Sequence, residues 1–157
     1  MRLLELTVAV GLWMLVAWGC SGPPSTPEQQ VKDTLRFGEE AAERRDIGAL
    51  AELVADGYQD DNGYDRRALL QLAQAYLMGH HSIHLLLREQ SIELVTPQRA
   101  EVAVLVAMAG EPLESADQLI NVRADLFKFE IVFVRTGNEQ WQVASAGWHR
   151  AGVDDFF

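Results

Sequence analysis

Cysteine and basic residues are the two kinds of residue that this chain has in short supply. One cysteine among 157 residues excludes an intrachain disulfide and a cysteine-based zinc site. There are 13 Lys and Arg against 23 Asp and Glu, giving a formal net charge of -10. Affinity for nucleic acid depends on clustered basic side chains, so this acidity argues against a nucleic-acid partner. Hydrophobic residues make up 48% of the chain, enough to bury a core in one domain.

The single cysteine stands at an informative position. An apolar run over residues 6–19 follows a charged start and ends directly at Cys20. The run is shorter than the roughly 20 residues that a membrane-spanning helix needs, and this favours a secretory signal. The sequence Ala17-Trp18-Gly19-Cys20 resembles the cleavage site of bacterial lipoproteins. An uncleaved N-terminal anchor and an ordinary signal peptide are the alternatives.

The lipoprotein resemblance divides the chain into three parts. Residues 1–19 are the expected signal peptide, 20–26 the lipidated cysteine with a flexible Gly/Pro/Ser tether, and 27–152 the folded domain. The resemblance implies a membrane anchor through lipid on Cys20. Ser21 is not the Asp associated with inner-membrane retention, so we expect an outer-membrane lipoprotein that faces the periplasm. Cleavage removes one acid and one base, so the net charge belongs to the domain.

Helical periodicity dominates the first half of the domain. The predicted N-caps of three helices are Thr26, Asp46 and Asp65. Gln29 is placed to complete a capping box in the first helix. Gly57 is expected to stop the second helix and Gly79 the third.

The period changes to two after residue 80. The predicted strands are 83–94 with a bend at 89–91, 100–109, 122–135 and 141–149. This order predicts an α+β domain with three N-terminal helices in the concave face of a curved, four-stranded, mostly antiparallel sheet.

Several weak motifs occur in a familiar order. They are the turn over 45–50, the segment over 53–60, the Gly-containing ending over 137–143 and the late Trp148. Together they resemble the nuclear transport factor two / SnoaL-like superfamily. The resemblance implies a cystatin-like cone, frequently a homodimer through the sheet. It implies no single function, because one fold hosts many.

No cofactor or metal site is expected. His80, His81 and His84 follow Gly79, where the pattern is strand-like. In an extended strand, His80 and His84 would be roughly 13 Å apart, too far to bind one ion together. The acidic loop that ends at Gly63 lacks the ligand spacing of a calcium hand.

Acid–base chemistry is the sharper hypothesis. Resemblance to ketosteroid isomerase-like enzymes implies a carboxylate base beside an apolar cavity and a tyrosine on the first helix, yet that helix position falls near Phe37. The candidate acid–base residues are Asp125, His84 and Asp61. Arg123 or His149 is expected to pair with Asp125, and a satisfied ion pair is the simpler interpretation of it. The residues expected to line a pocket are Tyr58, Asp60, Tyr64, Arg123, Phe127 and Trp148.

Three functional hypotheses follow from these patterns. The first is a lipid-anchored, non-catalytic module that binds a small apolar ligand or a protein. The second is a small isomerase or dehydratase that uses carboxylate or histidine chemistry in the cone pocket. The third is a purely structural dimer formed through the sheet.

Overall fold

The computed structural model describes residues 25–137 and 139–157. The predicted signal peptide, Cys20 and most of the tether lie outside these residues. Within the described ranges, no helix is both long and apolar enough to cross a membrane.

Three helices form the N-terminal half of the domain: α1 (Pro27–Glu43), α2 (Ile47–Leu53) and α3 (Arg66–Met78). All three predicted N-caps are confirmed, since each side chain accepts a hydrogen bond from a backbone N–H in the first turn. The capping box is only half formed, because the Gln29 side chain donates to Asp33 instead. Gly79 is the C-cap of α3 as predicted, but α2 ends well before Gly57. It ends early because Val54 turns extended and pairs with Val143.

The second half is a wholly antiparallel sheet in the order β1-β2-β3-β4. The strands are β1 (His84–Thr96), β2 (Arg99–Ala109), β3 (Ala124–Arg135) and β4 (Trp141–Arg150). A register shift between Glu89 and Ser91 is the bend predicted in the first strand. Another shift, between Val132 and Phe133, interrupts the pairing of β3 with β4.

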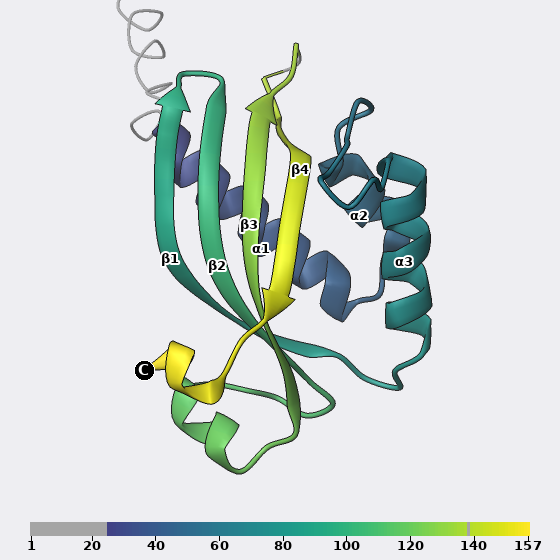
Figure 1. The fold of residues 1–157 in the computed structure, drawn as a ribbon, viewed down its shortest axis with the longest axis vertical. Helices are drawn as coiled ribbons and strands as arrows, with labels where there is room; N and C mark the ends of the chain where they lie inside the picture. Colours follow the sequence, from purple (N-terminus) through teal and green to yellow (C-terminus); the bar gives the residue numbers. More distant parts are fainter. Residues whose placement is uncertain (1–24, 138) are drawn as a thin grey trace, which may run out of the picture.

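Each face of the sheet buries a different core. On the concave face, α1 crosses the strands obliquely, and Val31 packs against Phe133 and Trp141 (Figure 1). The opposite face is covered at one end by two short 3-10 helices, η1 (Ala116–Ile120) and η2 (Val153–Phe156). Phe156 has no exposed surface, so the folded unit continues past residue 152. The predicted fold class is confirmed.

The two ends of the cone differ in what they carry. The start of α1 and the hairpins β1–β2 and β3–β4 gather at one end, whereas η1, η2 and the start of β3 lie at the other (Figure 1). Arg135, at the last residue of β3, donates to Gln30 in the first turn of α1. Asp125 lies ten positions earlier on the same strand, which at the strand rise is about 30 Å away. The start of α1 therefore lies at the end of the domain opposite Asp125.

Candidate functional site

A cavity of about 240 Å³ lies between the three helices and the concave face of the sheet. Its walls are almost wholly apolar. The helices and the segment before β1 contribute Ala42, Leu50, Leu69, Ala73, Tyr76, Leu77 and Ile83, and the strands contribute Leu85, Met108, Phe127, Phe129 and Trp148. An apolar enclosure of this kind, with polar groups confined to one edge, is typical of small-molecule sites.

A tyrosine and an aspartate meet at the edge of this cavity. The Tyr76 hydroxyl donates a hydrogen bond to Asp125 Oδ2 across 3.1 Å. Arg150 Nη1 lies 3.6 Å from the other carboxylate oxygen, and the Asp125 side chain keeps 40% of its surface exposed. Burial, and then the hydrogen bond to Asp125, raise the pKa of Tyr76 to about 12. Tyr76 is therefore a neutral hydrogen-bond donor throughout the physiological pH range.

A polar hollow of about 330 Å³ continues from the cavity and shares Tyr76, Ile83 and Met108 with it. His80 and Arg123 also line this hollow, which we call the mouth. His80 is fixed by two contacts: its Nδ1 lies 2.8 Å from the Tyr76 carbonyl oxygen, and its ring packs against that of Tyr76 with the centroids 4.5 Å apart and the planes tilted by 33°.

Four aromatic rings form a continuous wall behind the mouth. Tyr64 stacks on Trp148, Trp148 touches Phe129, and Phe129 touches Phe127, with ring centroids 6.1 to 6.2 Å apart. The Arg150 guanidinium lies 5.6 Å from the Phe127 centroid, a cation–π contact. Of the residues expected to line a pocket, Phe127 and Trp148 line this cavity, whereas Tyr64 does not and packs against Trp148 behind it.

Two of the predicted pocket residues belong to a different structure. Tyr58 and Asp60 are buried together, and the Tyr58 hydroxyl donates to Asp60 Oδ2 across 2.9 Å. The other Asp60 oxygen accepts from the backbone N–H groups of Asn62 and Tyr64, so it braces the loop. Neither residue lines the cavity. Asp61, in the same loop, is exposed and lies apart from the cavity lining.

The structure corrects the expected role of His84. Leu85 lines the cavity, so its neighbour His84 points to the opposite face of β1, where it is in register with Ala109 of the outer core. Side chains alternate along a strand, and this alternation excludes His84 from the cone interior.

The predicted pairing of Asp125 with Arg123 or His149 is also wrong. Strand β3 begins at Ala124, so the alternation that would place Arg123 beside Asp125 does not extend to it. His149 is in register with Lys128, which lies on the other face from Phe127. Arg150 is in register with Phe127 and so reaches the carboxylate instead.

Sequence reasoning missed Tyr76 and Arg150 as site residues. Tyr76 belongs to the apolar stripe predicted for the third helix. A hydroxyl group on that inward-facing stripe, near the end of the helix, is the feature of the sequence that could have indicated a site residue. Arg150 offered a weaker signal, because its contact depends on the register of β4 against β3.

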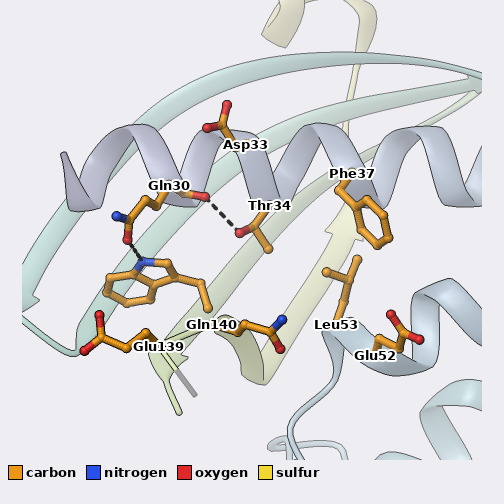
Figure 2. Close-up of a pocket in the computed structure, with 9 residues that line it drawn as sticks. Gln30, Asp33, Thr34, Phe37, Glu52, Leu53, Glu139 and Gln140 are labelled. Carbon is orange, nitrogen blue, oxygen red and sulfur yellow. Dashed lines mark hydrogen bonds between the residues drawn. The ribbon is translucent and has the colours of Figure 1, made fainter. Parts of the chain in front are cut away.

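A second hollow, an open groove of about 450 Å³, lies between α1, α2 and the β3–β4 hairpin. Figure 2 shows Phe37 and Leu53 facing each other across it, with Asp33, Glu52 and Glu139 around the rim. Its polar groups are largely engaged: the Gln30 side-chain oxygen accepts from the Trp141 indole, and Asp33 and Glu139 pair with arginines. The apolar cavity is therefore the better candidate site.

Metal-binding side chains do not converge in the described ranges. No group of three His, Cys, Asp or Glu side chains is close enough there to hold an ion.

Comparison with known proteins identifies the fold through structure alone. No family model matches the sequence, and no curated protein matches it. Among solved structures, a proposed dehydratase of the NTF2-like family from Streptomyces avermitilis aligns at a TM-score of 0.61 and 21% identity, covering 78% of this chain and 95% of that one. A proposed scytalone dehydratase from Novosphingobium aromaticivorans aligns at 0.64 and 11% identity, covering 78% and 83%.

A further similar structure is larger than this chain. Bd1075 from Bdellovibrio bacteriovorus aligns at a TM-score of 0.62 and 14% identity, over 79% of this chain but only 40% of its own. These likenesses show the fold. The described part of the chain has the NTF2-like α+β fold.

Proposed function

We propose that this protein is a lipid-anchored domain of the bacterial cell envelope whose cone cavity binds a small apolar ligand without transforming it. One observation carries the binding proposal: a cavity with nearly continuous apolar walls has its polar groups gathered at a single mouth. Burial of the apolar part of a ligand in such a site contributes roughly 25 cal/mol of binding free energy per Å² removed from water, and contacts at the polar end orient the ligand.

The anchor part of the proposal rests on the leader and on Cys20. The described domain begins at the end of the cone opposite Asp125, so a lipid on Cys20 would leave the mouth directed away from the membrane (Figure 1). We propose the periplasmic face of the outer membrane as the location. Mass spectrometry of the N-terminus tests for lipid on Cys20, and Cys20→Ser should move the protein out of the membrane fraction. An unmodified Cys20 in membrane-bound protein would contradict the anchor.

Binding is tested by filling the cavity. Ala73 lines it, whereas Ala75 lies two positions along α3 and is exposed. We expect 1-octanol to bind the full chain, Ala73→Phe to abolish that binding and Ala75→Phe to leave it unchanged. Calorimetry on nanodisc-embedded protein, with protein-free nanodiscs subtracted, measures all three. Equal binding by both variants would place the octanol elsewhere and contradict the proposal.

An enzymatic role is the second candidate, and the Tyr76–Asp125 pair favours it. A carboxylate with a neutral tyrosine donor beside an apolar cavity is the material of general acid–base catalysis. An isomerase or dehydratase would use Asp125 as the base and Tyr76 to donate to a developing oxyanion. Turnover of keto-steroid-like or dehydratable substrates, lost in Asp125→Asn, would support this role over the non-catalytic one.

A homodimer through the sheet stays a prediction. The outer face is covered at one end by η1 and η2, and beyond them it carries the Lys128–Glu130 ion pair. A dimer would therefore use the uncovered, more polar part of that face. Sedimentation equilibrium of the full chain distinguishes the monomer from the dimer.

A further inference from the structure

Arginine side chains gather at the mouth of the cavity, although the chain as a whole is strongly acidic. Arg123 lines the mouth, and Arg150 pairs with Asp125 at its edge. Arg45 reaches the same region and donates to the His80 carbonyl. The mouth itself is lined by one carboxylate, that of Asp125. When Glu43 is counted as well, since its Oε1 accepts from the Leu85 N–H beside the cavity, three arginines meet two carboxylates in this region, whereas the chain as a whole carries a formal net charge of -10.

Arg123 is exposed and has no ion-pair partner among the described residues. Most basic side chains in this part of the chain do have one. The paired ones are Lys32, Arg36, Arg44, Arg66, Arg99, Lys128, Arg135 and Arg150. In an acidic protein, a cation left unpaired beside an apolar cavity is available for an anion from outside.

The carboxylate at the mouth is already occupied. Asp125 accepts from Tyr76 and pairs with Arg150, so a cationic ligand would have to displace Arg150. An anionic ligand displaces no cation: Arg123 has no ion-pair partner in the described ranges, and Arg150, although paired with Asp125, keeps 77% of its side-chain surface exposed and has further N–H groups for a second carboxylate. Guanidinium groups also match carboxylates in shape and can bind them through two parallel hydrogen bonds.

We propose that the ligand is a short amphipathic acid, with its carboxylate held by Arg123 and Arg150 at the mouth and its apolar body in the cavity. This inference rests on the proposed binding function and names the class of its ligand. The cavity volume of about 240 Å³ sets the length. It falls below the range of about 300–1,000 Å³ that is usual for drug-sized ligands, so the apolar body is short.

Three probes with one tail and different heads test the proposal: octanoate, 1-octanol and octylammonium. They are titrated calorimetrically into the full chain in lipid nanodiscs, with protein-free nanodiscs subtracted. We expect octanoate to bind about tenfold more tightly than 1-octanol, the gain of one charge-assisted hydrogen bond, and octylammonium to bind most weakly.

Variants identify the head-group contact. Arg123→Gln should remove most of the advantage of octanoate and leave 1-octanol unchanged. Arg88→Gln is the matched control, because Arg88 is exposed and also lacks an ion pair in the described ranges, but it lies on β1 away from the mouth. Equal affinities for octanoate and 1-octanol, or an unchanged octanoate affinity in Arg123→Gln, would overturn the proposal that the ligand is an acid. The proposal that the cavity binds an apolar ligand would be unaffected. Binding of none of the probes would overturn the proposed function as well.

Discussion

The domain contains two hydrogen-bonded tyrosine–aspartate pairs that differ in almost everything except their chemistry. Tyr58 and Asp60 are two residues apart and are only 2% and 7% exposed. Tyr76 and Asp125 are far apart in the sequence and meet at the edge of a cavity. The contrast shows what separates a structural polar pair from one that is available to a ligand.

The buried pair has no remaining capacity for a ligand. Both Asp60 oxygens accept hydrogen bonds, and the Tyr58 hydroxyl also approaches the Ala146 carbonyl oxygen at 3.4 Å. The pair at the cavity keeps exposed carboxylate surface and a flexible arginine partner. Burial fixes the first pair in one arrangement, whereas the second can exchange a partner for a ligand group.

Removing the two carboxylates should give the largest difference. Asp60→Ala leaves a buried tyrosine hydroxyl and two backbone N–H groups without their acceptor, which we expect to lower the free energy of unfolding by about 3 kcal/mol. Asp125→Ala removes a half-exposed ion pair and should cost less than about 1 kcal/mol. Urea unfolding at pH 7 measures both. Similar losses in the two variants would mean that the second pair is structural too.

Removing the two hydroxyl groups should give a smaller difference of the same sign. Tyr58→Phe leaves Asp60 with one acceptor site unused in a buried position, at a cost of about 1.5 kcal/mol. Tyr76→Phe should cost about 0.5 kcal/mol, because water can replace the hydroxyl at Asp125. The same unfolding measurement applies, and a larger loss from Tyr76→Phe would reverse the assignment of the two pairs.

Alkaline pH should weaken the fold through the same tyrosines. Burial first, and then the neighbouring carboxylate, raise the pKa of both Tyr58 and Tyr76, the latter to about 12. Between pH 10 and 12 the unfolded state loses its phenolic protons before the folded state does, so stability falls as pH rises. Tyr76→Phe should flatten this fall. An unchanged slope between pH 10 and 11.5, measured by urea unfolding, would show that Tyr76 is not held in its protonated form.

The sequence predicted those parts of the molecule that depend on nearby residues. The three N-caps act within one helical turn, and the change from period 3.6 to period 2 marks where the sheet begins. The Tyr76–Asp125 contact could not be predicted in the same way, since it depends on how α3 packs against β3. Arg150 and His84 show two finer limits. A one-residue difference in the pairing of β4 with β3 decides whether His149 or Arg150 shares a face with Phe127, and the alternation along β1 does not say whether the side of His84 or that of Leu85 faces inward.

Glu39 on α1 is a partly buried carboxylate with no ion-pair partner in the described ranges, and its substitution should give the smallest effect. It is the reference for the two carboxylates that accept hydrogen bonds from tyrosines. Desolvation, and then repulsion from Glu43 and Glu40, raise its pKa above the ordinary value. Its protonated form is therefore favoured in the fold, and stability is lost as pH rises through the folded pKa.

Glu39→Gln should raise the free energy of unfolding by about 0.5 kcal/mol at pH 7, and the gain should vanish below about pH 4. Glu28→Gln is the matched control, since Glu28 pairs with Lys32 on the same helix and is not one of the carboxylates that repel Glu39, so its loss should give no gain. If the gain from Glu39→Gln persisted in acid, it would have to come from packing and not from removal of the charge. Charge would then not distinguish Glu39 from Asp60 and Asp125, the two carboxylates that accept hydrogen bonds from tyrosines.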